Sequence, residues 1–180
     1  MADQVLVKLA YEAAKQAFDA ARRALGDDEI VGYAILTHDT ADSCQPIFAT
    51  DRGVESFRFG SKQDFLFVPD NWDYDAHSQS FSALNKELQQ RYDAGDYEVD
   101  VDWHAKFSRS VFDSCVDSLE TLVREGYFEK LDCPNRPFVT LAVSDSDEMR
   151  TAAPGWVKRL NPKSVLDDFT HWHANTYSAK

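Results

Sequence analysis

Cysteine is scarce in this chain, which has three of them among 180 residues, Cys44, Cys115 and Cys133. Their number is odd and they are widely separated, so they show neither a disulfide framework nor the CxxC spacing of a zinc site. The sequence therefore predicts reduced thiols, no structural zinc and a cytoplasmic protein.

Long hydrophobic runs are missing as well. No apolar stretch approaches the roughly 20 residues that are needed to cross a bilayer. The first residues, Met1-Ala2-Asp3-Gln4, have no basic segment, no apolar segment and no cleavage site of a secretory signal. We therefore expect neither a membrane-spanning segment nor a signal peptide.

Basic residues are outnumbered by acidic ones, with 19 Lys and Arg against 31 Asp and Glu, for a net charge of -12. Between positions 64 and 102 there are ten acidic residues and two basic ones. Nucleic acid and anionic membranes need clustered Lys and Arg, so neither is an expected partner. A basic protein or a metal ion is compatible with this charge, and so is an acidic surface that serves only solubility.

Catalytic motifs are also lacking: the chain has no GxSxG elbow, no HExxH and no phosphate-binding loop. Cys115 lies on the apolar stripe of a predicted helix, where a thiol is usually inert. His171 and His173 are two residues apart, and in a helix they point in nearly opposite directions and cannot share a metal. The acidic turn of residues 145–148 lacks the glycine and the final glutamate of a calcium loop. The sequence predicts no catalytic residue, no cofactor and no metal.

The composition is that of a globular protein, with 43% hydrophobic and 13% aromatic residues in a chain long enough for one core. Helical periodicity predicts helices over residues 3–25, 80–93 and 107–123 and a short one from residue 164. Short runs rich in β-branched and aromatic residues predict strands at 30–36, 46–50, 65–68 and 138–143, the first two as a hairpin. We expect one α+β domain over residues 1–180, with a mainly antiparallel sheet packed against three to four helices. Its predicted core includes Leu9, Ile35, Phe107, Val111, Leu119, Leu122 and Leu141.

Acidic and apolar residues alternate from Asp96 to Trp103. In an extended strand Asp96, Glu98, Asp100 and Asp102 line one face, where their like charges repel one another. Such a row favours a cation-rich partner, although a solvated face is the alternative. Asp102 is also placed to cap the helix that follows.

A second stretch interleaves acids with aromatic rings, in the order Asp70-Asn71-Trp72-Asp73-Tyr74-Asp75. If Trp72 is exposed among Asp70, Asp73 and Asp75, the stretch suits binding to an arginine-rich surface by stacking and charge. In the alternative interpretation, Trp72 anchors a loop onto the core.

Four segments of the chain resemble a bacterial domain-of-unknown-function family, number 4303. These segments are 33–39, 69–74, 119–128 (Leu119-Glu120-Thr121-Leu122 leading into Glu125-Gly126-Tyr127-Phe128) and 143–148, the last followed by Leu160-Asn161. The resemblance implies a single α+β domain and supplies no catalytic residues. Small acidic bacterial proteins of this kind also resemble immunity proteins, which neutralise the toxins of competing bacteria.

Two functions are compatible with these observations. The first is an immunity-type inhibitor that covers the basic surface or active-site cleft of a cognate protein toxin. The second is a small enzyme or ligand-binding protein with a pocket near Trp72 and Asp145. The sequence leaves the choice between them, the identity of the partner and the oligomeric state open.

Overall fold

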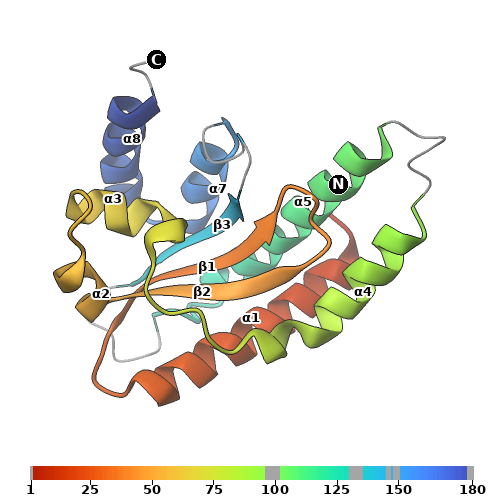
Figure 1. Ribbon diagram of the computed structural model, residues 1–180, viewed down its shortest axis with the longest axis horizontal. Coiled ribbons are helices and arrows are strands. Elements are labelled where there is room, and N and C mark those ends of the chain that lie inside the picture. Colours follow the sequence, from red (N-terminus) through yellow and green to blue (C-terminus); the bar gives the residue numbers. More distant parts are fainter. Residues whose placement is uncertain (1, 96–101, 130–135, 145–146, 148–150, 178–180) are drawn as a thin grey trace.

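The structure, a computed structural model, describes residues 2–95, 102–129, 136–144, 147 and 151–177 (Figure 1). In chain order its elements are α1 (Gln4–Leu25), β1 (Ile30–His38), β2 (Cys44–Thr50), α2 (Asp51–Ser56), α3 (Lys62–Phe67), the 3-10 helices η1 (Pro69–Asn71) and η2 (Ser78–Phe81), α4 (Ser82–Asp93), α5 (Trp103–Arg124), β3 (Phe138–Ser144), α7 (Ala153–Leu160) and α8 (Lys163–Tyr177). The fold is α+β, as the sequence predicted.

The sheet has three strands in the order β2-β1-β3. β1 and β2 form the predicted antiparallel hairpin, but β3 runs parallel to β1, so the sheet is mixed rather than mainly antiparallel. The reason is the length of the connection between β2 and β3, which contains several helices, including α5. A crossover of this kind allows two strands to run in the same direction.

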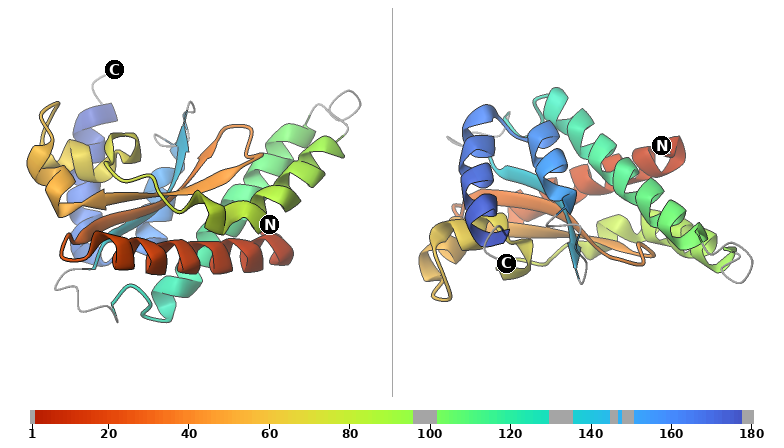
Figure 2. Two further views of the ribbon diagram at one scale, coloured as in Figure 1. Left: turned by 60° about the horizontal axis from the view of Figure 1, so that its bottom comes forward. Right: turned by 90° about the horizontal axis from the view of Figure 1, so that it is seen from above.

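Helices cover both faces of this sheet (Figure 2). On one face the ring of Phe18 in α1 contacts Tyr33 of β1 and Phe48 of β2. On the other face Phe138 of β3 contacts Phe67 of α3 and Phe169 of α8. Aromatic rings therefore provide much of the contact between the sheet and its helices.

Residues 65–68 were expected to form a strand, and this prediction is wrong. They belong mainly to α3, because Ser61 and Asp64 form a capping box that starts a helix. The Ser61 hydroxyl accepts from the Asp64 backbone N–H at 3.1 Å, and the Asp64 carboxylate accepts from the Ser61 N–H at 2.7 Å. Phe65 and Phe67, which read as strand residues, are buried from this short helix.

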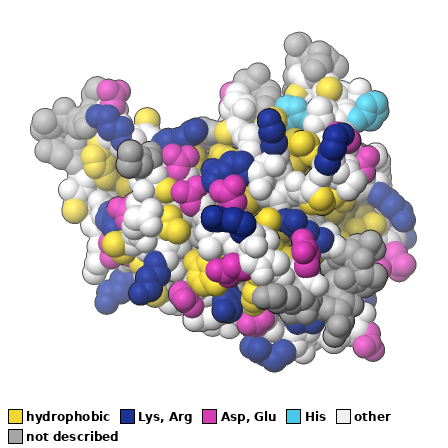
Figure 3. Space-filling model, turned by 180° about the vertical axis from the view of Figure 1, so that it is seen from behind, with side chains coloured by type: hydrophobic (Ala, Val, Ile, Leu, Met, Phe, Trp, Pro, Cys, Tyr) yellow, Lys and Arg dark blue, Asp and Glu magenta, His cyan; other side chains and the backbone are white. Residues whose placement is uncertain are grey.

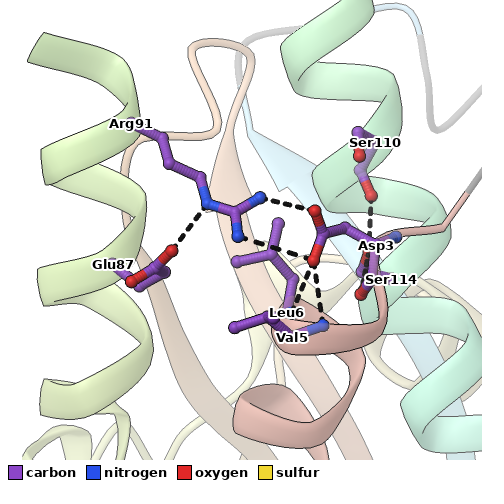
Figure 4. Close-up of polar contacts among 7 residues, drawn as sticks. All are labelled: Asp3, Val5, Leu6, Glu87, Arg91, Ser110 and Ser114. Carbon is purple, nitrogen blue, oxygen red and sulfur yellow. Dashed lines mark hydrogen bonds and ion pairs between the residues drawn. The ribbon is translucent and has the colours of Figure 1, made fainter. Parts of the chain in front are cut away.

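The start of α1 is held by an ion-pair network that joins three helices (Figure 4). Asp3 caps α1 by accepting from the backbone N–H groups of Val5 and Leu6. The same carboxylate pairs with Arg91 of α4 at 2.7 Å, and Arg91 pairs with Glu87 at 2.7 Å. The Asp3 N–H donates to Ser114 of α5 at 2.9 Å, so one residue ties α1 to both neighbouring helices.

Most of the predicted core is confirmed. Ile35, Val111, Leu119, Leu122 and Leu141 are at most 1% exposed, whereas Leu9 and Phe107 are half-buried and pack against the same cluster. Within the described part of the chain, none of the helices combines the length and the hydropathy that a membrane span requires.

Candidate functional site: an acidic cleft beside helix α2

The open end of the hairpin brings two acidic segments together. Ile30 at the start of β1 pairs with Thr50 at the end of β2, so the residues that flank this pair become neighbours. The Asp51 N–H donates to the Glu29 carbonyl oxygen at 3.0 Å. The turn of residues 27–29 therefore lies beside α2, and both are at the left edge of Figure 1.

Between these segments lies a cleft of about 420 Å³. Five of the seven residues that line it are acidic: Asp27, Asp28, Glu29, Asp51 and Glu55. Arg52 is the only basic residue in this lining, and its Nε lies 3.6 Å from the Asp28 carboxylate. The Asp28 side chain is 9% exposed and the Arg52 side chain 80% exposed, so Arg52 reaches this largely buried carboxylate from the solvent side.

The remaining carboxylates of the cleft have no basic partner among the residues that the structure describes. One oxygen of Glu29, Oε1, is buried and has no described hydrogen-bond donor. A buried acceptor without a donor carries a desolvation penalty of about 1–3 kcal/mol, and more when it is charged. With four carboxylates that have no described basic partner, the cleft is suited to a ligand that brings positive charge.

Asp73, one of the predicted partner-binding residues, does not line the cleft but stabilises the helix α2 that forms one side of it. Its carboxylate accepts from the Thr50 backbone N–H at 3.0 Å and from the Thr50 hydroxyl at 2.7 Å. The Thr50 hydroxyl in turn caps α2 by accepting from the Gly53 N–H at 3.0 Å. Asp73 thus holds the first turn of α2 in place through Thr50. Its role for the cleft is to position Asp51, which lies on that turn.

Trp72 does not form an exposed stacking surface, and the alternative interpretation holds. The side chain is 7% exposed and its Nε1 donates to the Phe65 carbonyl oxygen at 2.9 Å. Its ring lies against Gly32, where a Cβ atom would come within 2.8 Å of the indole. The absence of a side chain at Gly32 makes room for the ring, and Trp72 anchors its loop onto the sheet.

The other predicted site residues are spread over the surface. Asp70 and Asp75 are exposed on either side of Trp72, and burial together with the charge of Asp70 raises the pKa of Tyr177. Asp102 is exposed at the N-cap of α5, and its side chain makes no capping hydrogen bond. Asp96, Glu98 and Asp100, which form the rest of the acidic row, and Asp145 lie outside the described residues.

Two contacts between polar groups were not predicted from the sequence. At the carboxyl ends of the parallel strands, His38 Nδ1 lies 2.7 Å from Ser144 Oγ, but no described residue bonds the other ring nitrogen as the third member of a catalytic triad would. The buried Sγ atoms of Cys44 and Cys115 are 4.0 Å apart, and their hydrogen bond and burial raise the pKa of Cys115. In each pair the two residues are more than 70 positions apart in the chain, so no local motif indicates the contact.

Charge is more evenly mixed elsewhere. The face seen in Figure 3 carries basic and acidic side chains interspersed, with histidines at one edge. His171 and His173 both lie on α8, as expected. Among the described residues no three His, Cys, Asp or Glu side chains form a group that could hold a metal ion.

Comparison with known proteins identifies the family. The protein-family model described as Domain of unknown function (DUF4303) matches residues 11–162. The chain belongs to this family. No curated protein and no solved structure matches it. The DUF4303 match includes both segments that form the acidic cleft and the loop that carries Trp72 and Asp73.

Proposed function

We propose that this protein is a cytoplasmic binding module whose acidic cleft receives basic side chains of a partner protein. The observation that supports this proposal is the group of four carboxylates in one cleft, Asp27, Glu29, Asp51 and Glu55, that have no basic partner among the described residues. A volume of about 420 Å³ is within the range of sites that hold a small organic group, such as an extended arginine side chain.

We propose that the partner is a protein toxin and that this protein is the immunity-type inhibitor that neutralises it. Enzymes that act on anionic substrates have basic clefts, and an acidic inhibitor is drawn to such a cleft before contact is made. The net charge of -12 would contribute this long-range attraction, and the cleft beside α2 would contribute the specific contact. An Arg or Lys of the toxin would then be held by the inhibitor instead of by the substrate.

The proposal is tested with a labelled hexa-arginine peptide, whose binding is followed by fluorescence anisotropy in a salt series. The double variant Asp51→Asn/Glu55→Gln removes two charges from the cleft. Exposed ion pairs contribute about 0.2–1 kcal/mol each, so we expect a loss of roughly 2- to 30-fold in affinity at low salt. The loss should shrink as salt rises, because screening shortens the range of these charges.

A matched control has the same net charge but an intact cleft. Asp39→Asn/Glu12→Gln changes two exposed residues far from the cleft, Asp39 being just beyond the opposite end of β1. Equal losses in the two double variants would show that only net charge matters, and the cleft would then not be the binding site.

The immunity-type role is tested in cells. The protein is produced together with the polypeptide encoded beside its gene, and growth is measured. Protection by the wild type, reduced in Asp51→Asn/Glu55→Gln but kept in Asp39→Asn/Glu12→Gln, is the expected result. A neighbouring polypeptide that does not impair growth, or equal protection by all three proteins, would contradict this role.

A further inference from the structure

A second hollow lies on the other side of Asp51, and its chemistry is opposite to that of the acidic cleft. It has a volume of about 320 Å³ and lies between α2, α3, the starts of β1 and β3 and the first turn of α8. Most of its surface is apolar and is contributed by Val31, Val54, Leu66, Phe138 and Val165. All but Phe138 are only partly buried, so the pocket exposes a group of aliphatic side chains in one place.

The charged groups of this pocket are mainly basic. Arg136 and Lys62 line it together with a single acid, Asp51. Lys62 is exposed and makes no ion pair with a described residue. The pocket therefore combines an apolar wall with an excess of positive charge.

Arg136 is incompletely satisfied in this position. Its side chain is 17% exposed, and its Nη2 donates to the Leu160 carbonyl oxygen. Nη1 is 3.4 Å from the carboxylate of Glu129, a side chain that is 60% exposed, and Nε is buried without a described acceptor. Hydrogen bonds between these atom types are usually 2.7–3.2 Å long, so the bond to Glu129 is weak. Of the guanidinium nitrogens, Nη1 therefore has only this weak bond among the described residues and is the one left to pair with a ligand carboxylate.

We propose that this pocket binds a monoanionic amphiphile, a carboxylate carried on an apolar body of about the size of a medium-chain fatty acid. The apolar body would lie against Val54, Leu66 and Phe138, where burial of apolar surface contributes roughly 25 cal/mol per Å². The carboxylate would pair with Arg136, whose planar guanidinium suits it, and with the amine of Lys62. The volume is at the lower end of the roughly 300–1,000 Å³ of small-molecule sites, which favours a small ligand.

Calorimetric titrations with octanoate, octanol and octylamine test the charge preference. We expect octanoate to bind more tightly than octanol, and octylamine to bind least, because the three share an apolar chain and differ in the head group. Equal binding of the three probes, or no binding of octanoate, would overturn the proposal.

Variants then locate the site. Val54→Trp fills the pocket from α2 and should abolish octanoate binding while the circular dichroism spectrum is kept. Arg136→Gln removes a charged hydrogen-bond partner and should weaken octanoate by about 10- to 100-fold without weakening octanol. If Arg136→Gln does not fold, Lys62→Gln supplies the same test, with an expected loss of at most about fivefold that octanol does not share. Wild-type octanoate binding by Val54→Trp would contradict the assignment.

The acidic cleft and this pocket can be told apart. Asp27→Asn/Glu55→Gln should weaken the hexa-arginine peptide and leave octanoate binding unchanged, because neither residue lines the apolar pocket. Val54→Trp should abolish octanoate binding and leave binding of the hexa-arginine peptide unchanged, because Val54 lines only the apolar pocket. If both variants weakened both ligands, the two hollows would not be separate sites, and the proposal of a distinct anionic ligand would fail.

Discussion

At the scale of single residues, acidic side chains that look alike in the sequence do different things. Asp73 and Asp75 are two positions apart in the same acidic and aromatic stretch. Both are exposed, but Asp73 makes two hydrogen bonds to Thr50 and so stabilises the start of α2, whereas Asp75 makes no hydrogen bond or ion pair with a described residue. Sequence alone could not separate them, because Thr50 is 23 positions away from Asp73.

Replacement of Asp73 by alanine should therefore destabilise the fold. The backbone N–H and hydroxyl of Thr50 lose their acceptor, which costs about 1–3 kcal/mol. Asp75→Ala is the matched control and should change the free energy of unfolding by no more than about 0.5 kcal/mol. Urea denaturation measures both values, and equal values for the two variants would mean that Asp73 does not support α2.

The close packing around Gly32 leads to a second prediction, about the stability of a variant with a larger side chain at this position. A Cβ at this position would lie 2.8 Å from the Trp72 ring and 2.9 Å from the Ala49 Cβ, so Gly32→Ala overpacks the sheet and should cost roughly 1–3 kcal/mol. Gly155→Ala in α7 meets nothing within 4 Å and should be neutral or stabilising by up to about 1 kcal/mol. Thermal melts compare the two, and a Gly32→Ala variant as stable as the wild type would show that Trp72 is not packed against the sheet.

At the scale of elements, periodicity predicted most of the structure. The predicted helix over residues 3–25 is α1, and the apolar stripe from Phe107 to Val123 lies within α5. The hairpin and β3 are also where short β-branched runs placed them. α3 was missed because six residues contain too little of a helical period to outweigh Phe65 and Phe67, and only its Ser61–Asp64 capping box indicates a helix.

The start of α1 gives a pH-dependent prediction. The hydrogen bond from Arg91 is the largest influence on Asp3 and lowers its pKa in the folded protein. Since the folded pKa is below the unfolded value of about 3.9, the stabilisation by charge is present above that value and is lost as the pH falls through the folded pKa.

Two variants separate this charge from the cap. Asp3→Asn keeps a capping side chain and removes the charge, so at pH 7 it should cost up to about 1 kcal/mol for the part-exposed ion pair, and nothing near pH 2. Asp3→Ala also removes the cap and should remain about 0.5–2 kcal/mol less stable than Asp3→Asn at both pH values. Urea midpoints from pH 7 to pH 2 measure this, and a pH-independent gap between wild type and Asp3→Asn would contradict the role of Arg91.

At the scale of the whole molecule, acidity alone did not predict where the candidate site is. The sequence drew attention to residues 64–102, which carry most of the net negative charge, -8 of -12. The cleft is instead formed by Asp27, Asp28 and Glu29 together with Asp51 and Glu55, and neither group is conspicuous by itself. Only the hairpin register brings the two groups together, since residues just before β1 and just after β2 meet at its open end. A search for acids that flank both outer ends of a predicted hairpin would have found them.

The central claim is that the acidic cleft is where a basic partner makes contact, and an amide chemical-shift titration tests it most directly. A ¹⁵N-labelled sample is titrated with hexa-arginine, and the shift of every assigned amide signal is followed. We predict that the largest shifts cluster at residues 27–29 and 51–55 and are much smaller in Asp51→Asn/Glu55→Gln. Shifts centred on residues 70–75 or 96–102 instead, or small shifts spread over the whole surface, would contradict the assignment of the cleft.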